Sequence, residues 1–147
     1  MVSGMMAKVL EEKLRWFQAF MRLYGKAGPV IRHITNLEKL RSGELPVGPA
    51  ELVVSNLTLR PVLSALDKLQ KPKDKDLSEV QKEFRLALLN SIKASELAEK
   101  YLEYESRSKD RLIVLGMIIN AIVLAQEYLV SASKKLSPHL IESTLSE

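Results

Sequence analysis

The chain has 147 residues, 46% of them hydrophobic and 27% charged, a balance typical of one folded domain with a modest core. It has no cysteine, which excludes a disulfide framework and a thiolate metal site. The charge is uneven: residues 1–75 carry 13 Lys and Arg against 7 Asp and Glu, whereas residues 76–147 carry 9 against 11. A basic first half favours an anionic partner, although chance and solubility explain the same asymmetry.

Helical periodicity dominates the chain, so we expect an all-α fold, with an N-terminal amphipathic helical arm and a C-terminal helical bundle. The first predicted helix runs from Ser3 to Tyr24 and ends at Gly25, before a turn at Gly28 and Pro29. Charged residues near the start, such as Lys8, leave no apolar segment for a signal peptide, which predicts an intracellular protein.

The next predicted elements complete the arm. A second helix is expected from Pro29 to about Ser42, followed by the loop "GELPVGP" over residues 43–49. A third helical region is expected from Pro49 to Leu69, with a kink or break at Pro61. The polar segment "QKPKDKD", residues 70–76, then separates the arm, residues 1–75, from the bundle, residues 76–147.

The predicted bundle begins at Asp76, which has Glu79 three residues later as in a capping box. Its first helix extends to about Glu105, and residues 106–110 form a short turn. The next helix covers about residues 109–135, and Ser137 with Pro138 predicts the start of a last short helix.

The segment "LIVLGMIINAIVLA", residues 112–125, is apolar on all sides. It is shorter than the roughly 20 residues that a membrane span needs, and Gln126 and Glu127 follow it directly. We therefore expect the central, buried helix of the bundle, with lipid contact as the alternative.

The first helix has a basic side and an apolar side. At 100° per residue, Lys8, Arg15, Arg22 and Lys26 form one continuous ridge, as phosphate binding requires. The second helix adds further basic positions. The predicted nucleic-acid contacts are therefore Lys8, Arg15, Arg22, Lys26, Arg32, Lys39 and Arg41. The alternative is a solvated helix face, partly neutralised by acids such as Glu11.

The aromatic residues of "RWFQAFMRLYGKAGPVIRH", residues 15–33, lie opposite this ridge. Stacking proteins mix aromatic and basic residues on one face, so we interpret these side chains as packing residues, in the core or at a subunit contact. The apolar arc is wider than one neighbouring helix covers, which predicts at least a dimer. The predicted interface residues are Trp16, Phe17, Phe20, Met21 and Tyr24.

No enzyme signature is present in the sequence, so we expect no catalytic activity and no cofactor. Glu96, Glu99 and Glu103 share one helix face, but a diiron bundle would also need Glu-x-x-His pairs. The two histidines, His33 and His139, are far apart in the sequence and give no metal site.

Three segments carry a resemblance to a known family: "RWFQAF" with "YGK", "GELPVGP" followed by "LRPVLSALDKL", and "YLVSASKKLSP". Together with the basic arm and apolar bundle, they resemble the major capsid proteins of rod-shaped and filamentous viruses of hyperthermophilic archaea. The resemblance implies a capsid dimer, of one protein or of two related subunits, whose N-terminal helices wrap double-stranded DNA in A-form. It also implies a place in the virion, and in the host cytoplasm before assembly. The acids Glu11 and Glu12 within the arm depart from that pattern.

Two other functions fit the same sequence. One is a small helical subunit of a CRISPR-type ribonucleoprotein effector, which would bind single-stranded nucleic acid beside larger partners. The other is a helical interaction module without nucleic acid.

Overall fold

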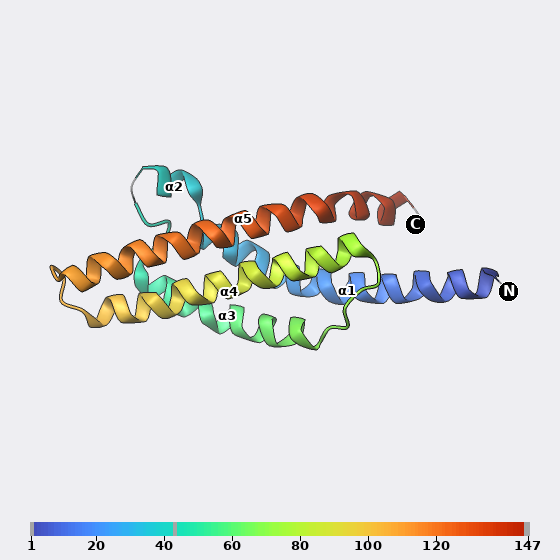
Figure 1. Ribbon diagram of the computed structural model, residues 1–147, viewed down its shortest axis with the longest axis horizontal. Helices are drawn as coiled ribbons and strands as arrows, with labels where there is room; N and C mark the ends of the chain where they lie inside the picture. Colours follow the sequence, from blue (N-terminus) through green and yellow to red (C-terminus); the bar gives the residue numbers. More distant parts are fainter. Residues whose placement is uncertain (1, 43, 146–147) are drawn as a thin grey trace.

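The computed structural model describes residues 2–42 and 44–145 and has the predicted all-α fold, with no strand among these residues. Figure 1 shows the helices in chain order. Their bounds are α1 Val2–Ile34, α2 Leu37–Arg41, α3 Pro49–Lys68, α4 Lys75–Glu103 and α5 Lys109–Leu145.

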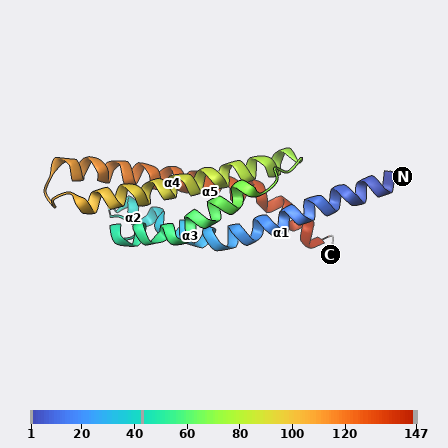
Figure 2. The same cartoon turned by 90° about the horizontal axis from the view of Figure 1, so that it is seen from below.

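The helices pack as an elongated bundle around α4. The helices α4 and α5 lie antiparallel along most of their length, and α3 packs on α4 (Figure 1). The second half of α1 packs against α3, α4 and α5, whereas its first turns extend beyond the end of α4 (Figure 2). The short helix α2 lies beside α5.

A single hydrophobic core joins all the long helices. It includes Phe20 and Ile31 of α1, Leu59 of α3, Phe84 of α4 and Ile118 of α5, each 0% exposed. The core therefore crosses the boundary that we predicted at residue 75.

The helix α1 does not end at Gly25, so that prediction is wrong. It continues to Ile34 through Gly28 and Pro29. Each glycine costs a helix only about 1 kcal/mol relative to alanine. Ala27, Ile31 and Ile34 are buried in the core beyond this point. Burying an isoleucine side chain contributes about 1.5–3 kcal/mol, so the burial of Ile31 and Ile34 together opposes the local preference to turn.

The prolines at 61 and 138 also lie inside helices, α3 and α5, so the predicted separate helix at Ser137 is wrong. A proline in a helix leaves the carbonyl four residues earlier without its partner. Pro29, Pro61 and Pro138 are all exposed, and so are the residues four positions before them, Gly25, Leu57 and Lys134. The three prolines therefore lie on exposed sides of their helices, where a carbonyl without its amide partner tilts outward toward water.

The helix α4 begins two residues earlier than predicted, because the N-cap is Asp74 and not Asp76. The Leu77 amide donates a hydrogen bond to Asp74 Oδ1 at 3.1 Å. The predicted second helix is also wrong: Pro29–Ile34 belongs to α1, and Asn36 caps the separate five-residue α2. The start of α3 at Pro49 is confirmed.

The helix α5 is buried on one side only, so the prediction of a central helix covered all round is wrong. Ile118 and Ile122 are fully buried, whereas Leu112 is 69% and Ile113 is 63% exposed. The segment Lys109–Leu140 is long and apolar enough to cross a membrane, and 33% of its most apolar window is buried within the chain. The core helix of a soluble protein meets the same criteria of length and composition.

Candidate nucleic-acid interface

The basic ridge of α1 comprises Lys8, Arg15, Arg22 and Lys26, and all four side chains are exposed. Because α1 is continuous, the ridge lies along a single helix and spans about 27 Å at 1.5 Å per residue. His33, seven residues after Lys26, lies on the same side of the helix. The helix forms because its other side, centred on Phe20 and Ile31, is buried in the core.

Local acids neutralise only part of the ridge. Arg15 Nη2 lies 2.8 Å from Glu11 Oε1, one turn earlier. His33 Nε2 lies 2.8 Å from Glu51 Oε1 of α3. Lys8, Arg22 and Lys26 have no ion pair with any described side chain. An exposed pair such as Arg15–Glu11 contributes about 0–1 kcal/mol, so a phosphate can replace the glutamate at small cost.

The other predicted basic contacts are not on this ridge. Arg32 donates a hydrogen bond to the Tyr24 hydroxyl at 2.9 Å, and its guanidinium lies 5.7 Å from the centre of that ring. Lys39 Nζ donates to the Pro46 carbonyl at 3.2 Å. The side chain of Arg41 lies outside the described part of the chain. The structure therefore groups four of the seven predicted contacts.

Three of the five predicted interface residues are core residues of the chain itself. Trp16, Phe17 and Phe20 are buried, so they are not available to another subunit. The Trp16 ring stacks on Phe20 with 4.7 Å between centroids, and Trp16 Nε1 donates to Gln81 Oε1 at 2.7 Å. Met21 and Tyr24 are half-buried against the same core. Trp16, Phe17 and Phe20 therefore pack in the core of the chain and do not form a subunit contact.

The uncovered part of the apolar arc of α1 lies nearer the N-terminus. Met6, Val9, Leu10 and Leu14 are each at least half exposed. At 100° per residue Val9, Leu10 and Leu14 lie in the apolar arc of the helix. The sequence pattern could not show that the core leaves them exposed.

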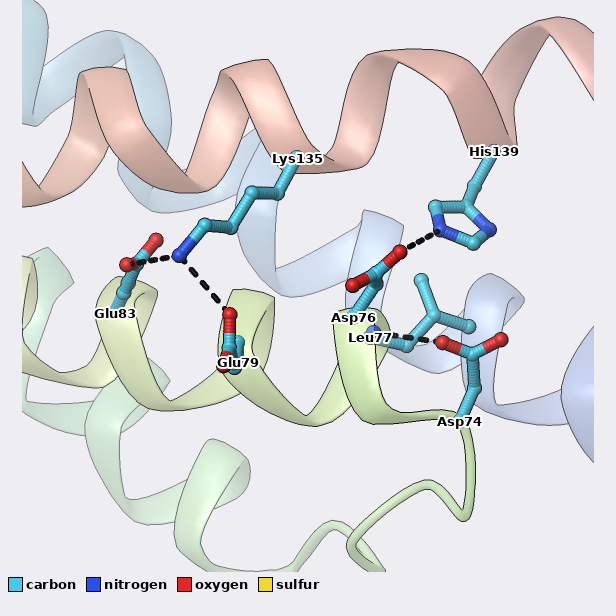
Figure 3. A network of polar contacts seen from close by, with 7 residues as sticks. All are labelled: Asp74, Asp76, Leu77, Glu79, Glu83, Lys135 and His139. Atoms are coloured by element: carbon cyan, nitrogen blue, oxygen red, sulfur yellow. Dashed lines mark hydrogen bonds and ion pairs between the residues drawn. The ribbon is translucent and has the colours of Figure 1, made fainter.

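A polar network joins the start of α4 to the second half of α5 (Figure 3). Lys135 Nζ lies 2.7 Å from Glu83 Oε1 and 3.1 Å from Glu79 Oε2. These hydrogen bonds, to Glu83 first and then to Glu79, raise the pKa of Lys135. The hydrogen bond from Lys135, reinforced by its positive charge, lowers the pKa of Glu79.

Next to this network, Asp74, Asp76 and His139 form a cluster whose possible ligand atoms all lie within 4.8 Å of one another. Two carboxylates and an imidazole are donors that a divalent cation accepts. However, Asp74 Oδ1 already caps α4, and its Oδ2 lies 3.9 Å from Lys13 Nζ. His139 Nε2 lies 3.9 Å from Asp76 Oδ2, and the N-cap role of Asp74 already accounts for one of the two carboxylates.

A cavity of about 430 Å³ lies between the first turns of α1 and the segment before α4. Val9, Leu10 and Trp16 form part of its apolar lining, and Lys71 and Lys73 lie on the other side. Lys73 Nζ is 4.0 Å from Glu12 Oε2 across it. Lys71 and Lys73 lie in a segment whose sequence predicts only a charged connector, so no sequence signal marks them as part of a site.

Comparisons with protein-family models, with curated proteins and with solved structures gave no match.

Proposed function

We propose that this chain is a structural, non-enzymatic subunit that binds double-stranded DNA through its phosphates, as the capsid subunit of a filamentous archaeal virus. The observation that carries the proposal is the basic ridge on α1, which lies opposite the buried aromatic side of the same helix. The bundle holds that helix from one side, so the ridge is free to meet a long anionic ligand.

The dimensions and charge of the ridge suit a nucleic-acid backbone. Duplex DNA carries about one charge per 1.7 Å of its axis, so a ridge of about 27 Å faces many phosphates. Arginine forks onto phosphate oxygens, and Lys8 and Lys26 supply flexible point charges near the ends. Such contacts give affinity without reading the base sequence.

The position of the aromatic residues favours duplex over single-stranded nucleic acid. Proteins that bind single strands stack the bases on exposed aromatic rings beside basic residues. Here Trp16, Phe17 and Phe20 are buried, and so is Phe84. The CRISPR-type alternative, which needs a single strand, has no such platform beside the ridge.

The first turns of α1 support assembly. Met6, Val9, Leu10 and Leu14 are exposed apolar side chains on the helix that carries the ridge. An arm that follows DNA meets neighbouring copies along the same duplex, and these side chains would then be covered. We therefore expect at least a dimer, and ordered filaments when DNA is present.

The test replaces Lys8, Arg15, Arg22 and Lys26 together with glutamine. Because all four are exposed, the melting temperature should not change by more than about 2 °C. The slope of log affinity against log salt concentration should fall by about 0.9 for each phosphate that the variant no longer binds. The matched control replaces four exposed lysines of α4 and α5, which removes the same charge from another surface: Lys82, Lys93, Lys100 and Lys134.

Binding of a linear duplex and of a single strand is measured for the wild type and both variants at several salt concentrations. A decrease of affinity and slope only in the ridge variant supports the proposal, and regular filaments with the duplex in electron micrographs support the capsid role. Equal decreases in both variants would mean that net charge, not the ridge, binds DNA. Unchanged binding in the ridge variant, or a preference for the single strand, would contradict the proposal.

A further inference from the structure

The free face of α5 is mainly apolar over about three and a half turns and is flanked by residues of opposite charge. We define the outer face of α5 as Leu112, Ile113, Gly116, Asn120, Val123 and Leu124. All are exposed except Val123, which is half-buried. Lys109 precedes this face and Glu127 follows it, and both are exposed. The helix packs on α4 along one side, and the short helix α2 lies beside it on another (Figure 1).

The outer face is arranged symmetrically about Ile118. Leu112 and Leu124 lie six residues on either side of it, Ile113 and Val123 five, and Gly116 and Asn120 two. Ile118 itself is 0% exposed and points into the core. The centre of the outer face is therefore on the opposite side of the helix at the same level, where a twofold axis can pass.

The charges have the same symmetry but opposite signs. Lys109 and Glu127 each lie nine residues from Ile118, and their separation of 18 residues is five full turns, so both are on the outer side. Neither has an ion pair with another described side chain. In an antiparallel pair of α5 helices that cross at Ile118, Lys109 of each copy meets Glu127 of the other. A parallel pair would place like charges together.

We propose that the outer face of α5 binds the same face of a second copy of this chain, antiparallel, with a twofold axis at the level of Ile118. Gly116 then lies opposite the partner's Asn120 at the centre. A side chain added at Gly116 would have no atom within 4 Å in the single chain, so this glycine leaves room for another backbone to approach. A single polar residue such as Asn120 in an apolar contact fixes the register of paired helices.

This proposal deepens the self-association part of the proposed function and does not depend on DNA binding. None of its residues belongs to the basic ridge of α1. The experiment is therefore carried out without nucleic acid, so that failure of DNA binding leaves it unaffected, and its own failure leaves the ridge test unaffected.

The test is charge reversal at the two ends, followed by sedimentation equilibrium over a range of protein concentrations. Lys109→Glu and Glu127→Lys should each weaken the dimer by about ten-fold or more, because each places two like-charged pairs in the contact. An equimolar mixture of the two single variants should regain wild-type affinity, since every end then joins a lysine to a glutamate. Lys93→Glu, an exposed position on α4, should leave the dimer unchanged.

A second variant tests the centre of the face. Gly116→Leu has open space in the single chain, so it should fold normally and still weaken the dimer by separating the helices. The proposal is overturned if the wild type stays monomeric at all concentrations, or if the charge variants match it. It is also overturned if mixing does not restore the dimer. Flotation of the wild type with phosphatidylcholine vesicles would instead assign the outer face to a membrane.

Discussion

The two longest helices, α1 and α5, offer different surfaces on the sides that the core leaves free. The free side of α1 in the bundle is basic, and its apolar side is covered by the core after residue 16. The free side of α5 is apolar, although the helix is equally well anchored through Ile118 and Ile122. A basic free side suits an anionic ligand, which binds through charge. An apolar free side suits a partner that covers it and excludes water.

The largest effect should come from the buried side of α1. Phe20→Ala should lower the free energy of unfolding by about 3–5 kcal/mol, because the ring is 0% exposed and contacts Trp16, Tyr24 and Phe84. Leu10→Ala, on the exposed turns, should change it by less than about 0.5 kcal/mol. Urea unfolding followed by circular dichroism measures both. Equal losses of stability would mean that α1 is covered along its whole length.

The same contrast can be measured across α5. Ile118→Ala should lower the free energy of unfolding by about 2–5 kcal/mol, because the side chain is fully buried. Leu112→Ala, 69% exposed, should cost less than about 0.5 kcal/mol at low protein concentration. A cost below about 1 kcal/mol for Ile118→Ala would place the core elsewhere and strengthen the case for lipid contact.

A smaller effect tests whether α1 is continuous. Gly25 is exposed, and a side chain added there meets no atom within 4 Å. Gly25→Ala should therefore stabilise the protein by about 0.4–1 kcal/mol, through helix propensity and a less flexible unfolded chain. If α1 instead ended there in a left-handed conformation, alanine would be strained and thermal unfolding would occur at a lower temperature.

The smallest effect concerns the polar network that joins α4 to α5. Because the pKa of Glu79 is lowered from its ordinary value of 4.5, its pair with Lys135 stabilises the fold above that pH and loses this contribution as the pH falls. Lys135→Gln should therefore lower the melting temperature at about pH 6 and have less effect at about pH 3. Lys134→Gln, its exposed neighbour, is the control and should show no such difference. A decrease that is equal at both pH values would mean packing, not charge.

Much of the fold follows from the sequence where local and tertiary preferences agree. Pro49 begins α3 as predicted, and Lys109 begins α5. The break expected at Gly25 is absent because the burial of Ala27, Ile31 and Ile34 outweighs helix propensity there. No local sequence pattern indicates the free energy that would be lost if Ala27, Ile31 and Ile34 stayed exposed to water. The cap at Asp74 was missed because Asp76 carries an equally good local pattern.

The candidate site was predictable to a similar extent. The periodicity of α1 predicts the ridge, since a polar side and an apolar side differ in composition. It does not predict that the core covers Trp16 and leaves Leu10 exposed, because that depends on where α4 begins. The outer face of α5 carries no such signal, because a helix that is apolar on all sides does not indicate which side faces the core.

The connection between α4 and α5 has a consequence for the order of folding. These helices are joined by a short turn over residues 104–108, so their contacts close small loops. The bond from Trp16 to Gln81 spans 65 residues, and the bond between Tyr24 and Ser133 spans 109. Because long loops close at a greater entropic cost, we expect the α4–α5 hairpin to form first and α1 to dock last.

In stopped-flow experiments Ile118→Ala should then slow refolding, whereas Phe20→Ala should mainly speed unfolding. The helix α1, which carries the basic ridge that we propose for DNA binding, would thus be the last segment to join the fold and the first to leave it.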